Sequence, residues 1–91
     1  MRAPRVDANQ RRIVEALEAV GATVASLAGV GRGCPDLLVG YHGRNYLIEV
    51  KNMDRRGWGL TPDQDEWHLT WKGQAAVVGT VADALQVIGF V

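Results

Sequence analysis

The chain lacks several features that commonly identify a function. Its single cysteine, Cys34, excludes an intrachain disulfide, and no CxxC motif or cluster of histidines and cysteines offers a zinc site. No apolar run is long enough to span a membrane, and no segment has the pattern of a secretion signal. We therefore expect a cytoplasmic protein.

The chain also lacks an excess of charge of either sign. Ten basic and ten acidic residues give a formal net charge of zero, so no global electrostatic signature of nucleic-acid binding is present. The basic residues are nevertheless clustered near the N-terminus and after residue 51: Arg2, Arg5, Arg11, Arg12, Arg55 and Arg56. With 91 residues, 47% of them hydrophobic, the chain is one domain near the size where oligomerisation adds stability.

Two carboxylates and an amine lie in segments that otherwise have the composition of buried strands. Asp36 precedes the apolar run 37–41, and Glu49 and Lys51 lie at the end of the run 46–51. Charged side chains are rarely found in such segments without a metal ion or a reaction that requires them. These three residues are therefore the candidate chemical groups.

Their geometry follows from residue numbers if residues 42–43 form the tight loop of a hairpin. Counting outwards from that loop places Asp36 opposite Glu49, and Lys51 shares their face. Opposed carboxylates destabilise a sheet unless a cation lies between them, and hard oxygen ligands favour Mg²⁺ or Mn²⁺. A bulge or a longer turn would shift the pairing by one residue and turn Asp36 away.

A purely structural explanation of the same residues is also open. Asp36 would cap a turn after Pro35, while Glu49 and Lys51 would form an ion pair at an exposed sheet edge. The runs around them are apolar on both faces, however, which predicts a central strand covered on both sides. We therefore favour the functional interpretation.

The remaining pattern predicts alternating helices and strands without repeats or linkers. Asp7 with Gln10 reads as a capping box, and Thr61 followed by Pro62 marks a second helix start. Three glycines between residues 29 and 33 predict an irregular loop rather than a dinucleotide-binding motif, because no helix follows them. The predicted elements are helices at 8–20, 62–72 and 81–88, strands at 22–27 and 75–79, and the hairpin at 36–51.

The motifs, in this order, resemble the PD-(D/E)XK nuclease superfamily. They are Gly33-x-Pro35-Asp36, Glu49-Val50-Lys51, and Leu60-Thr61-Pro62-Asp63-Gln64 after a glycine-containing loop. Within the superfamily the chain is most similar to the stand-alone VRR-NUC domains of phages and bacteria, with Holliday-junction resolvases as more distant relatives. The resemblance implies one nuclease domain, residues 1–91, in the cytoplasm of a bacterium or phage-infected host cell. Its fold would be α/β, with a restriction-endonuclease-like αβββαβα core and a mixed central sheet flanked by helices.

The resemblance also assigns roles to individual residues. Asp36 and Glu49 would bind Mg²⁺ or Mn²⁺ with the help of the Val50 carbonyl. Lys51 would position or polarise the attacking water and the scissile phosphate, and Gln64 would match the helix glutamine that lies beside the site in this family.

The first helix matches the family less closely. Family members often carry a glutamate and a glutamine near its start, where this chain has Asp7 and Gln10. We favour Gln10 over Glu15 as a neighbour of the site, because Glu15 points roughly opposite to Gln10 on a helix. Helix capping alone explains Asp7 and Gln10 equally well.

Several loop residues are candidates for contact with DNA, namely Arg32, Arg55, Arg56 and Trp58. Trp67 and Trp71 lie four residues apart, a spacing that usually packs into a core or a dimer surface. His68 is not required by the proposed chemistry and reads as a residue of the helix surface or of an interface.

The sequence thus predicts a metal-dependent DNA endonuclease that hydrolyses phosphodiester bonds and selects branched or junction DNA by structure. We expect a homodimer that presents two antiparallel sites, with no membrane partner and no small-molecule cofactor. The alternative is a non-catalytic DNA-binding or interaction module on the same fold. A hydrolase with a serine or cysteine nucleophile lacks support, because neither Ser26 nor Cys34 has a recognisable base partner.

Overall fold

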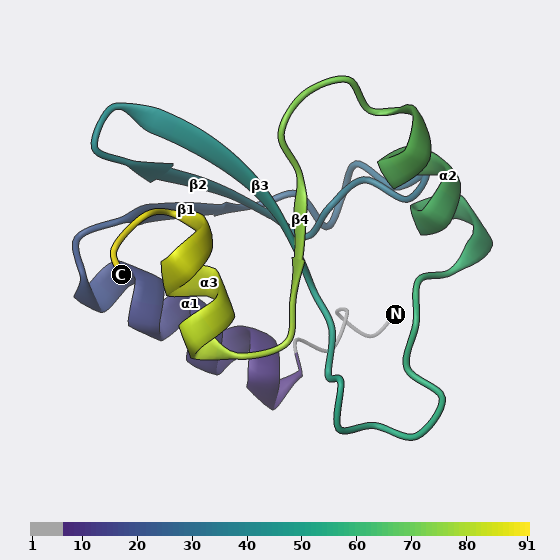
Figure 1. Ribbon diagram of the computed structural model, residues 1–91, viewed down its shortest axis with the longest axis horizontal. Coiled ribbons are helices and arrows are strands. Elements are labelled where there is room, and N and C mark those ends of the chain that lie inside the picture. Colours follow the sequence, from purple (N-terminus) through teal and green to yellow (C-terminus); the bar gives the residue numbers. More distant parts are fainter. Residues whose placement is uncertain (1–6) are drawn as a thin grey trace.

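The computed structural model describes residues 7–91, so the basic residues Arg2 and Arg5 lie outside the described part of the chain. Seven elements follow one another in the predicted order (Figure 1). They are α1 (Ala8–Ala19), β1 (Thr23–Ser26), β2 (Leu37–Tyr41), β3 (Arg44–Val50), α2 (Pro62–Thr70), β4 (Ala76–Val78) and α3 (Val81–Val87). The α/β class and the αβββαβα order are confirmed.

The helices begin where the capping signals predict. The side chain of Asp7 accepts a hydrogen bond of 2.9 Å from the backbone N–H of Gln10 and so starts α1. Thr61 caps α2 and Thr80 caps α3 by the same kind of bond to the third helical residue. Each cap satisfies a backbone N–H that has no partner inside the helix.

The four strands form one mixed sheet in the order β1-β2-β3-β4, antiparallel except for the parallel β3–β4 pair. The β2–β3 loop is formed by His42 and Gly43, both with positive φ (48° and 77°), as two-residue hairpin loops require. Tyr41 therefore pairs with Arg44, and the register continues to Leu37 opposite Ile48. The predicted register is confirmed, and Asp36 directly precedes the paired residues.

Two helices cover one face of this sheet. In Figure 1, α1 and α3 lie side by side against the strands, while α2 lies apart at the other end of the domain. The core between them consists of buried aliphatic side chains from α1, α3 and the inward-facing strand positions, including Ile13, Leu17, Leu37, Val39, Ile48 and Val78. The described part of the chain contains no helix that is long and apolar enough to cross a membrane.

The opposite face of the sheet is only partly covered, and the prediction of a central strand covered on both sides holds for the end of β3 that carries Glu49, where residues 48–50 are all buried. β3 is central, between β2 and β4. On its second face, however, Leu38 remains 36% exposed, its partner Ala25 is exposed and Leu47 is half-buried. Apolar residues on both faces suggested two covering layers, but only α2 and its flanking loops approach this face, near its Asp36 end.

The outer edge of β3 has a side-chain neighbour where β4 is too short to pair. β4 pairs with residues 48–50 of β3 only. At Leu47, the side chain of Gln74 accepts a hydrogen bond from the backbone N–H (2.7 Å) and donates one to the backbone carbonyl (3.1 Å). Gln74 thus replaces one residue of a neighbouring strand.

Helix α2 ends at Thr70, two residues before the predicted end at Lys72. Trp71 is already extended (φ −67°, ψ 126°), and its ring stacks on that of Trp67 with centroids 4.7 Å apart. The Thr70 hydroxyl donates to the carbonyl of Glu66 at 2.9 Å, a local bond that competes with helix continuation. Trp71 thus leaves the helix at the point where its ring stacks on that of Trp67.

Candidate active site

The charged residues at the open end of the hairpin line a cavity of about 330 Å³. The start of α1, the end of β3, the loop 52–59 and the first turn of α2 surround it. Its lining is mainly polar: Asp7, Gln10, Asp36, Glu49, Val50, Lys51, Asn52, Arg55, Gly57, Trp58, Gly59 and Gln64. The cavity therefore collects the candidate acidic, basic and amide groups from these four segments and from Asp36, which precedes β2.

Asp36 lies at the entrance to β2 and is half-buried. Its Oδ2 accepts a hydrogen bond of 2.8 Å from the backbone N–H of Val50. This bond links the residue before β2 to β3, so that a side chain extends the hairpin beyond its last backbone pair. It fixes the Asp36 carboxylate beside the strand that carries Glu49.

Glu49 is the one buried charged residue among those that the structure describes, with 1% of its surface exposed. Its Oε2 accepts a hydrogen bond of 3.4 Å from the side-chain amide of Gln64, whereas its Oε1 is buried without a partner. Buried polar atoms nearly always have a hydrogen-bond partner. The unpartnered Oε1 of Glu49, which lies beside a second carboxylate, can therefore bind a cation or a proton.

The electrostatics of the pair point in the same direction. Burial, and then the hydrogen bond and charge of Asp36, raise the pKa of Glu49 to about 8, although Lys51 lowers it. Without a cation, Glu49 therefore holds a proton at neutral pH. A divalent ion would replace that proton and remove the repulsion between the two carboxylates.

The few oxygen ligands at this site suit Mg²⁺ or Mn²⁺, which keep bound waters, better than a metal ion that takes all its ligands from the protein. In the described residues no group of three or more His, Cys, Asp or Glu side chains could hold an ion. Mg²⁺ commonly uses one or two carboxylates and keeps several waters. Asp36 and Glu49 meet that requirement, and the main-chain carbonyl of Val50, which also lines the cavity, is a further oxygen.

Lys51 follows the last residue of β3 and is half-buried. Its backbone N–H donates to the carbonyl of Val78 at 2.9 Å, so the parallel pairing with β4 continues to this residue. The alternation of a strand then puts Lys51 on the face of Glu49. Because Glu49 is buried in a central strand, the explanation by an ion pair at an exposed sheet edge does not hold.

Gln64 connects this carboxylate pair to α2. Its side-chain oxygen accepts a hydrogen bond of 3.0 Å from the backbone N–H of Thr61, and its backbone N–H donates to the Thr61 hydroxyl at 3.2 Å. This capping box orients the amide, so that its nitrogen faces Glu49. A helix-start motif thereby also supplies a hydrogen-bond donor to the site.

The loop before Asp36 supports α2 from the other side. A Cβ at Gly33 would collide with the main-chain carbonyl of Asp63, in the first turn of α2, and φ at Gly33 is +80°. Only glycine combines this backbone conformation with so close an approach. The loop and α2 are therefore packed backbone to backbone, directly beside Gln64.

Comparison with known proteins identifies the domain. No family model and no curated protein matches the sequence. A solved structure described as "VRR_NUC domain" aligns with 87% of this chain and 88% of its own, with a TM-score of 0.67 and 31% sequence identity. The chain belongs to the VRR-NUC family. It is a nuclease-type domain with the restriction-endonuclease-like fold, and the resemblance seen in the motifs is confirmed.

Within this VRR-NUC domain, most of the predicted site residues come together. Asp36, Glu49, Val50, Lys51, Gln64 and Gln10 all line the same cavity, as do Arg55 and Trp58 of the loop 52–59. Trp58 is 46% exposed at this surface. The cavity thus has an acidic interior and a rim that carries an arginine and an aromatic ring.

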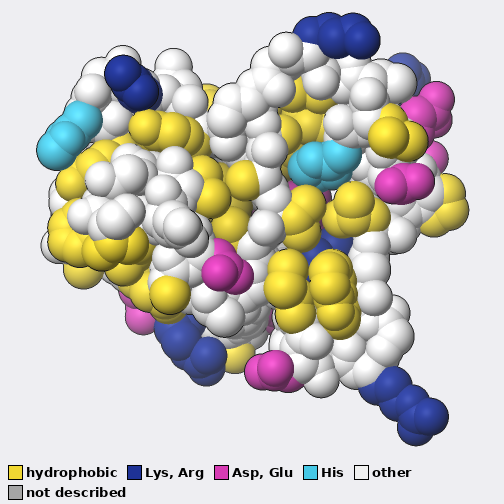
Figure 2. Space-filling model, viewed as in Figure 1, with side chains coloured by type: hydrophobic (Ala, Val, Ile, Leu, Met, Phe, Trp, Pro, Cys, Tyr) yellow, Lys and Arg dark blue, Asp and Glu magenta, His cyan; other side chains and the backbone are white. Residues whose placement is uncertain are grey.

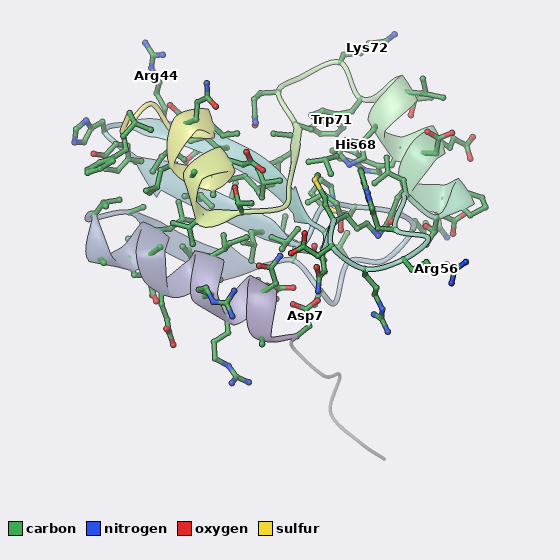
Figure 3. The ribbon with its side chains drawn as sticks, turned by 60° about the horizontal axis from the view of Figure 1, so that its bottom comes forward. Asp7, Arg44, Arg56, His68, Trp71 and Lys72 are labelled. Carbon is green, nitrogen blue, oxygen red and sulfur yellow. The ribbon has the colours of Figure 1, made fainter. Side chains whose placement is uncertain are left out.

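Two predicted DNA contacts lie elsewhere. Arg56 does not line the cavity and points away from the domain (Figure 3). Arg32, with φ of 56°, lines a separate cavity of about 300 Å³ together with Asp63, Glu66, Trp67 and Thr70. The acidic neighbours of Arg32 make that surface unfavourable for phosphate.

Sequence reasoning weighed Asp7 as a match to the family's glutamate without counting it among the site residues, and it left out Asn9. Asp7 caps α1 and also lines the cavity, so capping and proximity to the site are not alternatives. Its place at the start of the first helix was the available signal. Asn9 donates hydrogen bonds to the carbonyls of Lys51 and Gly79, and nothing in the local sequence indicates this.

Proposed function

We propose that this VRR-NUC domain is a metal-dependent endonuclease that hydrolyses phosphodiester bonds in DNA. The observation that carries the proposal is the buried Glu49 carboxylate, which has one oxygen without a partner and lies beside Asp36 and Lys51. A structural carboxylate in this position would destabilise the sheet. A carboxylate that binds a cation explains both its burial and its neighbours.

The residues of the cavity would divide the work of hydrolysis. Asp36, Glu49 and the Val50 carbonyl would hold Mg²⁺ or Mn²⁺, which when bound activates water and stabilises charge on the phosphoryl and leaving oxygens. The Lys51 ammonium would position the attacking water or the scissile phosphate by charge-assisted hydrogen bonds. Gln64 would keep Glu49 in place, and Gln10 would contact the water or the phosphate from α1.

The rim of the cavity supports a role in binding DNA. Arg55 can neutralise a backbone phosphate, and the exposed ring of Trp58 can stack on an unpaired base. Bases at the branch points of flaps and junctions unstack more readily than bases in regular duplex DNA. We therefore propose selection of branched or junction DNA by its structure.

A homodimer would give so small a nuclease two sites at a fixed spacing. Figure 2 shows hydrophobic side chains gathered at the surface between α2 and the strands. α2 has no fully buried side chain, and Leu69 and Trp71 are 75% and 47% exposed. Phe90 and Val91 are also exposed, but they lie at the far end of the domain from α2 (Figure 1). We place the dimer surface at α2.

A panel of labelled linear, nicked, flapped and four-way DNAs, each with Mg²⁺, Mn²⁺ or Ca²⁺, tests the proposed function. We expect cleavage of branched substrates with Mg²⁺ or Mn²⁺, binding without cleavage in Ca²⁺, and no cleavage by Asp36→Asn. The competing function, a non-catalytic DNA-binding module, predicts equal binding in all three metals and no product in any of them.

A further inference from the structure

Asn9 joins three parts of the domain through one side-chain nitrogen. It lies in the first turn of α1, and its Nδ2 donates to the backbone carbonyl of Lys51 at 3.2 Å and to that of Gly79 at 3.1 Å. These two carbonyls follow the last paired residues of β3 and β4. The amide therefore closes the ends of two parallel strands against a helix.

The hydrogen bond from Asn9 restrains Lys51 just beyond the last backbone pairing of β3. The backbone N–H of Lys51 still donates to the carbonyl of Val78, but among the described residues no strand N–H donates to the carbonyl of Lys51. Residues 52–59, which directly follow, form a loop with bends and turns. Without Asn9, the peptide between Lys51 and Asn52 would be restrained on one side only.

The same contact sets the distance between α1 and the site. Asn9 lies between Asp7 and Gln10, which both line the cavity from the first turn of α1. Gln10 and Lys51 line the same cavity, with this turn attached to the ends of β3 and β4. Asn9 provides that attachment from inside the turn.

We propose that Asn9 is a positioning residue, which acts on phosphodiester hydrolysis through Lys51. The inference rests on the proposed function and adds to it a residue that touches neither metal nor DNA. Its amide aligns the Lys51 backbone so that the ammonium group reaches the reacting phosphate. A misplacement of about 1 Å in such a group can lower the rate by about a hundredfold.

Gln74 offers a matched control at another part of β3. Like Asn9, its side-chain amide makes two hydrogen bonds to backbone groups, but both are at Leu47, which does not line the cavity. Removing either amide costs the protein a similar set of contacts. Only the removal of Asn9 should affect Lys51.

The experiment compares Asn9→Ala, Gln74→Ala and wild type in single-turnover cleavage of branched DNA with Mg²⁺. Alanine is favourable in a helix, which offsets part of the lost stability of Asn9→Ala. We expect its maximal rate to fall about tenfold to a hundredfold while the DNA concentration at half-saturation stays within about twofold. Gln74→Ala should keep the wild-type rate.

A double-mutant cycle with Lys51→Met separates positioning from general destabilisation. If Asn9 acts through Lys51, adding Asn9→Ala to Lys51→Met should lower the residual rate by no more than about twofold. A loss in the double variant equal to the product of the two single losses would overturn the inference. So would a wild-type rate in a folded Asn9→Ala.

A measurement without turnover completes the test. In the metal-free protein, the carbonyl ¹³C resonance of Lys51 should move in Asn9→Ala and remain unchanged in Gln74→Ala, because only the first loses its hydrogen-bond donor. An unchanged Lys51 resonance in Asn9→Ala contradicts the positioning role while leaving the nuclease function intact. A wild-type protein that cleaves no DNA with any metal contradicts the nuclease function instead.

Discussion

Gly33 and Asp63 touch through their backbones, because Gly33 has no side chain to keep α2 away from the loop that leads to Asp36. This contact holds the first turn of α2, with Gln64, against the carboxylate pair. The position of one glycine therefore bears on the geometry of the acidic site. Its replacement gives the first prediction.

Gly33→Ala should lower the free energy of unfolding by about 2–4 kcal/mol, because it combines a left-handed backbone with a backbone collision. Gly31 is the matched control, since its φ is +75° but a Cβ there would meet nothing within 4 Å. Gly31→Ala should cost only about 1 kcal/mol. Urea unfolding of both variants measures the difference. Equal losses of unfolding free energy would show that α2 can move away from residue 33 without destabilising the fold.

Asp36→Asn and Glu49→Gln should abolish cleavage while preserving or raising the stability of the metal-free fold. Asp36→Asn removes the charge that helps to raise the pKa of Glu49, and Glu49→Gln replaces a carboxyl that is protonated in the metal-free protein by an amide of similar shape. Mg²⁺ should raise the melting temperature of wild type but not that of Asp36→Asn, because a ligand that binds only the folded state stabilises it. Thermal melting and nuclease assays on the same variants test both effects, and wild-type activity in either variant would refute the metal site.

The stability of the metal-free protein should fall as pH rises from about 5 to 8. The pKa of Glu49 is raised from 4.5 to about 8, so the folded state binds a proton there that the unfolded state has released. This group stabilises the fold fully below pH 4.5 and loses that contribution as pH rises towards about 8. Urea unfolding in EDTA across this range should show the slope in wild type and a much flatter one in Glu49→Gln. A stability that increases with pH in wild type would contradict the burial of a protonated Glu49.

Lys51→Met should leave divalent-ion binding largely intact and reduce turnover by orders of magnitude, as for the loss of a contact made in the transition state. Calorimetric titration with Mn²⁺, beside a single-turnover assay, separates the two effects. If the affinity for metal collapses and the residual rate follows metal occupancy, Lys51 has a structural role only.

Light scattering at micromolar concentration should report about twice the 9.9 kDa mass of the chain. Leu69→Glu, at a position that is 75% exposed on α2, should yield a monomer with weak or single-strand nicking activity. Phe90→Glu, at the far end of the domain, should remain a dimer. A wild-type monomer that cleaves branched DNA at full rate would refute this assembly but not the chemistry.

The sequence was informative wherever a local rule determines geometry. The two-residue loop at His42 and Gly43 sets the parity of the hairpin, and parity alone places Asp36 opposite Glu49. Side-chain caps at Asp7, Thr61 and Thr80 likewise predict the helix starts to within a residue. These features depend on neighbours within a few positions along the chain.

The features that escaped prediction depend on residues far apart in sequence. The bonds of Asn9 span 42 and 70 positions, and no pattern around Asn9 indicates them. The early end of α2 coincides with the stacking of Trp71 on Trp67, and the acidic surroundings of Arg32 depend on how the glycine loop meets α2. Apolar strand residues do not reveal how many layers cover them, as the exposed Leu38 shows.

The amide of Gln74 on the edge of β3 has a consequence for behaviour at high concentration. Beyond β4, the edge of β3 would offer unpaired N–H and carbonyl groups to a strand of another molecule. Gln74 occupies those of Leu47, the last such residue before β4 begins. Pairing of a foreign strand with this exposed stretch of β3 is thus obstructed by one glutamine, and a chain that lacks it should precipitate sooner on storage.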